Sequence, residues 1–332
     1  MLLRRQPLFL FLYLLPFVLI GIFKSLDFGV DTPRYLDEFL FYADGGSIFM
    51  RTFEPGFGFI SMIIGKYASL PFLFFLFFHN TFFATSILML SRMVNYETIF
   101  FVNSLMSLSF FSFSNSGIRQ TLAISILCIA MYWLISCRKV AVYWILVAIA
   151  ALFHNSAIIS GTILFGIFLI SVPMTKAKPS FIFIIFLSVC GFAIASSTLL
   201  SFLYESYSNP LNDDLVLNFK LPVVFSVVSI AGLMLAFTNR QRVIKNFRLC
   251  YEVDNGSINV FRFVVVLLIT VPALYWVSTE IRLVDRVALY LVPAYWLIIS
   301  MVFSASLSRR SMYLVNIISV VFLSFVVMRV IL

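Results

Sequence analysis

The chain has 332 residues and a formal net charge of +9, and 62% of its residues are hydrophobic while 11% are charged. Its mean hydropathy is +1.06, and one soluble core could not hide so much apolar surface. The composition excludes an ordinary soluble domain and predicts an all-α integral membrane protein. The basic residues are scattered over short loops and form no continuous stripe, so nucleic acid is not an expected partner.

Apolar runs that approach the length of a membrane span recur along the whole chain. A spanning helix needs about 20 apolar residues. No linker divides the runs, so we expect a single polytopic domain over residues 1–332, with membrane lipid as its solvent. The eleven expected transmembrane helices lie at about 8–23, 70–90, 98–114, 117–136, 140–153, 155–172, 180–199, 220–237, 259–277, 287–305 and 311–330.

The basic loops predict which side of the membrane each loop faces, because Lys and Arg are enriched in short cytoplasmic loops. The anchors are Arg4-Arg5, Arg138-Lys139, Lys176 with Lys178, Arg240 to Arg248, and Arg309-Arg310. They predict a multi-pass protein of the bacterial inner membrane with a cytoplasmic N-terminus. The expected extracytoplasmic loops are 24–55, 115–119, 154–155, 200–219 and 278–286.

The apolar segment 56–68 is the exception to this threading. If it crossed the membrane, every later loop would be inverted and the basic clusters would face outward. We therefore expect a re-entrant or interfacial half-helix there. With this assignment the two sides carry +11 and −2, which sum to the +9 of the whole chain.

Two polar residues mark expected helix starts on the outer side. Glu54 precedes Pro55-Gly56, and proline is favoured in a first helical turn. Glu54 could act as a base or belong to a plain helix start. Arg119 lies in the first turn of 117–136, where it opposes the helix dipole, so a phosphate or diphosphate is a fitting partner. The alternative is that Arg119 reaches toward lipid headgroups.

His154 occupies the outer turn between the expected helices 140–153 and 155–172. An ionisable residue at membrane depth is a functional candidate by default. It could relay protons or donate to a phosphate, or it could make a structural hydrogen bond between helices.

Two further polar groups complete the candidate site. The outer loop 24–55 carries Asp31, Arg34 and Tyr35, whose polarity could also reflect simple solvation. Around the start of 287–305 lie Arg282, Asp285, Arg286 and Tyr290, where mutual salt bridging is the alternative.

The helix starts matter more together than singly. Helices beginning near residues 55, 117, 155 and 286 would all direct their N-termini outward. Glu54, Arg119, His154 and Arg286 would then lie at one level. Such an arrangement is typical of a site for an anionic substrate at the membrane surface.

The ordered motifs resemble the EpsG-type family of polysaccharide polymerases, which are similar in role to the Wzy O-antigen polymerases. The similarity is best over residues 30–170. The motifs that carry it are Asp31 followed by Tyr35, Phe53-Glu54-Pro55-Gly56, residues 111–120 with Leu122-Ala123, Leu152 to Ala157, and Asp285-Arg286 with Tyr290.

The resemblance implies an all-helical glycosyltransferase that joins undecaprenyl-diphosphate-linked oligosaccharide repeats on the periplasmic face, for O-antigen, capsule or exopolysaccharide. It also implies a separate chain-length-determining co-polymerase and a flippase that delivers the substrate. No nucleotide sugar or other cofactor is expected.

We expect these residues to have different roles in the reaction. Arg119 with Arg282 or Arg286 would stabilise the charge on the leaving diphosphate. Glu54 and Asp31 are candidate bases, and His154 is either a second phosphate donor or the base itself. We expect no metal, because no outward Asp, Glu or His cluster has ligand spacing.

Two other function classes stay open from the sequence alone. A lipid-linked oligosaccharide flippase would need charges near the midplane of the membrane. A membrane acyltransferase modifying surface sugars would use His154 as its base.

Overall fold

A computed structural model of the chain describes residues 31–48, 54–94, 117–171, 215–246, 260–278 and 282–308, together with a few isolated positions near the two ends. This part contains ten α-helices and no strand, in agreement with the predicted all-α class. The helices are α2 (Thr32–Ala43), α3 (Pro55–Tyr67), α4 (Pro71–Ser91), α6 (Ile118–Cys137), α7 (Val140–Ala151), α8 (Ser156–Ser171), α10 (Leu215–Thr238), α11 (Arg240–Asn246), α12 (Val260–Ser278) and α13 (Arg282–Ser306).

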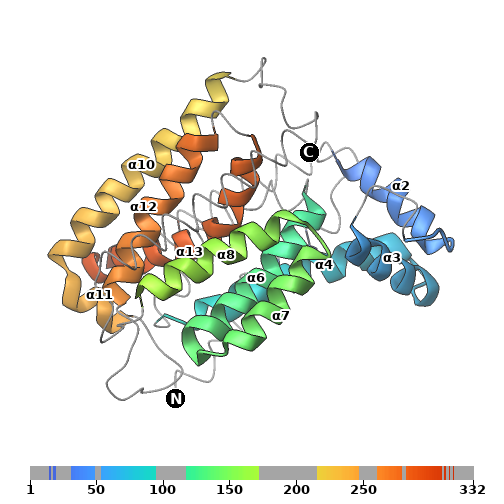
Figure 1. Ribbon diagram of the computed structural model, residues 1–332, viewed down its shortest axis with the longest axis horizontal. Coiled ribbons are helices and arrows are strands. Elements are labelled where there is room, and N and C mark those ends of the chain that lie inside the picture. Colours follow the sequence, from blue (N-terminus) through green and yellow to red (C-terminus); the bar gives the residue numbers. More distant parts are fainter. Residues whose placement is uncertain are drawn as a thin grey trace.

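Helices α2, α3 and α4 form one end of the molecule (Figure 1). Each begins with a proline in its first turn, where the missing N–H costs nothing. A buried phenylalanine of α4 contacts one buried phenylalanine from each of the other two helices. The ring of Phe75 lies 5.3 Å from that of Phe39 and 5.4 Å from that of Phe57, centroid to centroid. This aromatic contact fixes the end of α3 that carries Glu54 against its neighbours.

Helix α6 lies at the centre and contacts α4, α7, α8 and α13. Its neighbours α7 and α8 form an antiparallel pair that is locked at one point. The Tyr143 hydroxyl of α7 donates to the Gly161 carbonyl of α8. A Cβ at Gly161 would lie 2.8 Å from Val147 Cγ1, so glycine permits this close approach. The pair therefore holds the turn that bears His154 in a defined place.

Helices α10, α12 and α13 pack together on the other side of α8 (Figure 1). Phe225 of α10 stacks on Tyr275 of α12 with 4.4 Å between ring centroids. The buried Tyr295 hydroxyl of α13 lies 2.8 Å from Ser229 Oγ and donates to the Phe225 carbonyl at 3.1 Å. A buried polar group is thus satisfied between helices, as a membrane interior requires.

Several helices can cross a membrane, which makes the chain a multi-pass membrane protein. Helices α4, α6, α12 and residues Val284–Ser306 of α13 are long and apolar enough. The pair Pro222–Thr238 and Arg240–Asn246, bent by 99°, would make a fifth span if counted as one.

The expected count of eleven spans is not supported. Helices α7 and α8 coincide with two expected spans, but they have 12 and 16 residues, fewer than the roughly 20 that a span needs. The basic turn at Arg138-Lys139 and the turn at His154 bound α7 on its two sides. The expected spans 8–23, 98–114, 180–199 and 311–330 lie outside the described residues.

The outer loop expected at 24–55 contains a helix that the sequence did not predict. Helix α2 buries Tyr35, Glu38, Phe39 and Tyr42, which share one helical face, and exposes Arg34, Asp37 and Leu40. The expected half-helix 56–68 is present as α3, which has 13 residues. Its re-entrant or interfacial character stays a prediction.

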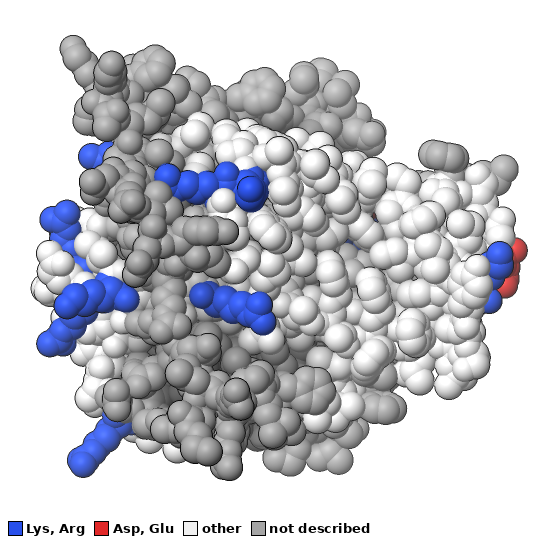
Figure 2. Space-filling model, turned by 90° about the horizontal axis from the view of Figure 1, so that it is seen from below, with Lys and Arg blue, Asp and Glu red and all other residues white. Residues whose placement is uncertain are grey.

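Basic side chains gather on one face of the molecule (Figure 2), while acidic ones appear at the edge farthest from most of them. Arg138 ends α6 and Arg119 lies at its start, so about 28 Å of helix separates them at 1.5 Å per residue. The described basic residues of the expected cytoplasmic loops, to which Arg92 and Arg262 also belong, are exposed at Arg92, Lys139, Arg240, Arg242, Lys245, Arg262 and Arg310.

Candidate functional site

The candidate site lies where four helices begin. Glu54 immediately precedes α3, Arg119 is the second residue of α6, His154 lies in the turn before α8, and Arg286 is in the first turns of α13. The start of each helix leaves backbone N–H groups without partners inside the helix, which favours negative charge nearby. The structure therefore brings together the residues that the sequence predicted at one level.

Glu54 and Arg119 form an ion pair, although 65 residues separate them along the chain. Their side chains are 14% and 18% exposed, so the pair is largely shielded from solvent. The guanidinium of Arg119 also lies over the Tyr35 ring, 5.9 Å from its centroid. Glu54 supplies the negative partner that an arginine at a helix N-terminus requires.

A backbone contact fixes Glu54 relative to the His154 turn. The Gly56 N–H donates to the Leu152 carbonyl at 2.7 Å. A Cβ at Gly56 would lie 2.7 Å from that oxygen and 2.9 Å from the Leu152 carbonyl carbon. Only glycine allows this approach, which joins the start of α3 to the turn between α7 and α8.

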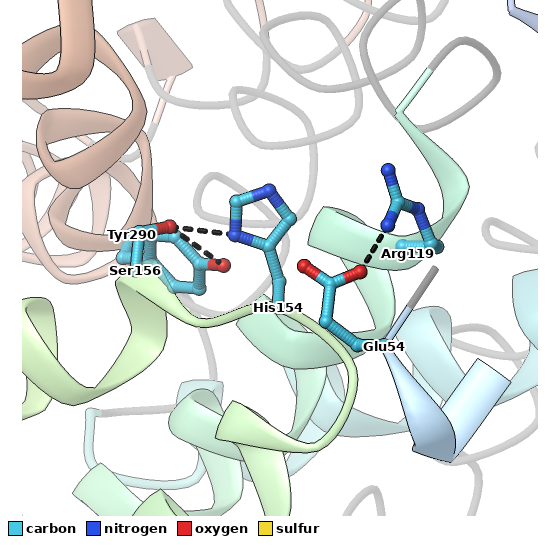
Figure 3. Close-up of polar contacts among 5 residues, drawn as sticks. All are labelled: Glu54, Arg119, His154, Ser156 and Tyr290. Atoms are coloured by element: carbon cyan, nitrogen blue, oxygen red, sulfur yellow. Dashed lines mark hydrogen bonds and ion pairs between the residues drawn. The ribbon is translucent and has the colours of Figure 1, made fainter. Parts of the chain in front are cut away.

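His154 lies in a short chain of polar contacts (Figure 3). Its Nδ1 is 2.7 Å from Ser156 Oγ, and Ser156 donates to the Tyr290 hydroxyl at 3.4 Å. Burial, and then the positive charges of Arg119 and Arg286, lower the pKa of His154 to about 3. The imidazole is therefore neutral at pH 7.

Two hydrogen bonds hold the start of α13 in register with its neighbours. Gln120 Nε2 of α6 donates to the Arg286 carbonyl at 3.0 Å, and Ser160 Oγ of α8 donates to the Val287 carbonyl at 3.3 Å. The charges of Glu54, Arg119 and Arg286 all act on Tyr290. Arginine side chains beside a neutral histidine at helix starts are the groups that a site for an anionic ligand would use.

The remaining predicted residues are placed less centrally. Tyr35 is buried, and this burial raises the pKa of its phenol, with the Arg119 charge opposing the shift. Asp31 and Arg34 are exposed at the start of α2. Asp285 lies in the first turn of α13, and its charge acts on Tyr275 of α12. The side chain of Arg282 lies outside the described residues.

Three contributors to the site were not predicted. Ser156 was noticed only as part of a motif, Gln120 only as the neighbour of Arg119, and Leu152 contributes through its carbonyl, which no sequence pattern reveals. Their roles depend on partners more than 90 residues away: Gly56, Arg286 and Tyr290.

Metal ligation is a separate question. Within the described ranges no group of three or more His, Cys, Asp or Glu side chains is placed to hold a metal ion.

The fold and site define a class: a helical, multi-pass membrane protein with a cluster of polar residues where several of its helices begin. The family model of the EpsG family matches residues 7–332, nearly the whole chain. The chain belongs to the EpsG family, as its motifs predicted, and this membership implies a function like that of a polysaccharide polymerase. A search of curated proteins and a search of solved structures each gave no match.

Proposed function

We propose that this protein is a glycosyltransferase that joins undecaprenyl-diphosphate-linked oligosaccharide repeats on the periplasmic face of the inner membrane, as in O-antigen biosynthesis. The observation that carries the proposal is the shielded ion pair of Arg119 and Glu54 beside neutral His154 at converging helix starts. Such a site offers a cation for a diphosphate and acceptors for a hydroxyl proton within one small volume.

The reaction exchanges one bond to the anomeric carbon for another. An acceptor sugar hydroxyl attacks the anomeric carbon of the chain carried by the donor lipid. The bond from that carbon to the diphosphate breaks, and the lipid diphosphate leaves with the electron pair. The hydroxyl proton passes to a protein base, for which Glu54, Asp31 and His154 are the candidates.

Arginines would stabilise the leaving group, since Arg pairs with phosphate oxygens bidentately. Arg119 and Arg286 both act electrostatically on His154, so both lie in its neighbourhood. Before the substrate binds, the Arg119 guanidinium is paired with the Glu54 carboxylate. A diphosphate would compete for that guanidinium and release the Glu54 carboxylate beside the reacting sugars. Substrate binding would thus free a base. Arg34, Tyr35, Arg282, Asp285 and Tyr290 are the proposed supporting contacts.

The proposed setting follows the charge distribution. The N-terminus and the basic face would be cytoplasmic, and the site would face the periplasm. The single domain over residues 1–332 belongs to the same proposal. A flippase would deliver the lipid-linked repeats, and a co-polymerase would set chain length. The reaction as written needs no nucleotide sugar and no metal.

The test is the surface-polysaccharide ladder of a deletion strain, resolved by gel electrophoresis. The strain is complemented with wild type, Arg119→Ala, His154→Ala or Glu54→Gln at matched membrane levels. Arg92→Ala serves as control, because Arg92 is an exposed arginine at the other end of the helices. We expect deletion and the three site variants to leave single repeats, while wild type and the control restore the ladder.

Other outcomes would identify the other function classes. Repeats trapped on the cytoplasmic side would indicate a flippase. Full-length chains that lack a modification would indicate an acyltransferase. Either result would overturn the polymerase proposal.

A further inference from the structure

The Ser156 hydroxyl has one proton and two polar neighbours, so it can donate a hydrogen bond to only one of them. Its Oγ donates to the Tyr290 hydroxyl at 3.4 Å and lies 2.7 Å from His154 Nδ1. The donor and acceptor roles in the shorter contact depend on the tautomer of His154. When the Ser156 proton is directed to Tyr290, the imidazole is the donor in the shorter contact, and His154 Nδ1 then carries the proton that Ser156 Oγ accepts.

A neutral imidazole carries only one ring proton. His154 is neutral at pH 7, because burial and two arginines oppose its protonation. With the proton on Nδ1, Nε2 is left with a free lone pair. Figure 3 shows Nδ1 turned toward Ser156 and the second ring nitrogen turned away from it. The arrangement leaves Nε2 as a proton acceptor and prevents it from donating to a phosphate.

The chain of contacts joins separate elements of the fold. His154 belongs to the turn before α8, Ser156 is the first residue of α8, and Tyr290 lies on α13. Ser156 is 4% exposed and Tyr290 is 2% exposed. The rings of His154 and Tyr290 are 6.3 Å apart between centroids. Solvent does not compete for these hydroxyls, so the orientation they impose on the imidazole is maintained.

We propose that Ser156, supported by Tyr290, is a positioning residue that holds His154 in the Nδ1–H tautomer, so that Nε2 takes the proton of the attacking sugar hydroxyl. The identity of that hydroxyl rests on the proposed function. As the oxygen bonds to the anomeric carbon and the lipid diphosphate departs, its proton moves to Nε2 and an imidazolium forms. This assigns to His154 one of the two roles that the sequence left open.

The same geometry couples this base to the donor substrate. Burial and then the charges of Arg119 and Arg286 disfavour an imidazolium while no anionic ligand is bound. A diphosphate bound to these arginines offsets their charge and so favours proton uptake at Nε2. The base therefore becomes stronger when the donor lipid is bound.

The tautomer can be measured directly, without any polymerisation assay. The chain has two histidines. Protein with ¹⁵N-labelled imidazoles is placed in lipid nanodiscs at pH 7, and the spectrum of His154→Gln identifies the resonances of the other histidine. We expect wild-type His154 to be protonated at Nδ1. In Ser156→Ala the Nε2–H form should appear, because the hydrogen bond that sets the tautomer is gone. Ser156→Thr, which keeps a hydroxyl, should retain the Nδ1–H form.

A matched control is available on the same helix. Ser171 is also buried in α8 and donates to the Ile167 carbonyl at 2.7 Å, at the end of α8 opposite to Ser156. Ser171→Ala should leave the His154 resonances and the polysaccharide ladder unchanged. Ser156→Ala should lower polymerisation at least about tenfold, since a histidine in the wrong tautomer can lose up to about 10⁴-fold in rate.

The outcomes separate this proposal from the proposed function. An Nε2–H tautomer in wild type overturns the tautomer assignment, even if deletion collapses the ladder. An intact ladder in the deletion strain overturns polymerisation, even if Nδ1 is protonated. Full polymerisation by Ser156→Ala overturns the positioning role. An Nδ1–H wild type with loss in Ser156→Ala and rescue in Ser156→Thr supports it.

Discussion

Replacing Gly56 by alanine tests whether the contact between α3 and the α7–α8 turn positions the site. The added Cβ would lie 2.7 Å from the Leu152 oxygen, whereas ordinary van der Waals contact begins at 3.4 Å. The two backbones must therefore separate by about 0.7 Å. The Gly56 N–H···O bond would lengthen from 2.7 Å by a similar amount and leave the usual range of about 2.7–3.2 Å.

The expected cost has two parts. Overpacking costs about 1–3 kcal/mol, and a lost hydrogen bond adds about 1 kcal/mol. The larger effect should be on rate, because Glu54 is two residues from the displaced backbone. A misplacement of about 1 Å can cost about 10²-fold. We expect Gly56→Ala to reduce polymerisation by about that factor, with a lower melting temperature in nanodiscs.

Gly58→Ala is the matched control on the same helix. Its Cβ would meet the Tyr42 side chain at 3.2 Å rather than a backbone atom. A ring that shifts by a few tenths of an ångström can accommodate it, so activity should stay within a fewfold of wild type. If Gly56→Ala polymerises normally at matched membrane levels, the contact does not position Glu54 and the reasoning is wrong.

Three other predictions address charge, pH and topology. Arg119→Lys keeps the positive charge but loses bidentate geometry, so ladder synthesis should fall less than in Arg119→Ala, for which a loss of about 10²–10³-fold is expected; a rate equal to wild type in Arg119→Lys would exclude a role for bidentate geometry, and a rate equal to Arg119→Ala would exclude a role for the charge alone. The pKa of His154 is lowered from 6.5 to about 3, so the unfolded chain binds a proton that the folded chain excludes as pH falls below 6.5. The melting temperature of wild type should therefore decline more steeply from pH 7 to 4.5 than that of His154→Gln, and parallel curves would contradict the burial of a neutral imidazole. In a chain whose four cysteines are serines, a membrane-impermeant maleimide should label Asp37→Cys in intact spheroplasts and Lys139→Cys only after lysis; the reverse pattern would invert the proposed topology.

Long apolar runs made the central helices predictable. Helices α6 and α12 begin and end within one residue of the expected spans 117–136 and 259–277. Helix α2 was missed because its buried residues recur only once per turn among charged ones, so the segment resembles a solvated loop. The span count was overestimated where short apolar runs form short helices, as in α7.

The sequence also predicted which helix starts lie together at the site, whereas the contacts between the side chains there were not predictable. Counting helix starts placed Glu54, Arg119 and His154 together, because each precedes or opens a helix in the same direction. Nothing in the local sequence indicates that Arg119 pairs with Glu54 or that Ser156 reaches Tyr290. Such pairs depend on how distant helices pack. Whether these residues catalyse the reaction stays a prediction for the variants above.

The short α7–α8 hairpin has a consequence for the surrounding bilayer. At 1.5 Å per residue, its helices are about 18 and 24 Å long, against a hydrocarbon core of about 30 Å. If the hairpin crosses the membrane, this hydrophobic mismatch of about 6–12 Å has to be met by thinning the bilayer beside it. A dimple of this kind would bring headgroups and water down to the His154 turn. A carrier lipid could then present its diphosphate at that depth without leaving the leaflet that holds its tail.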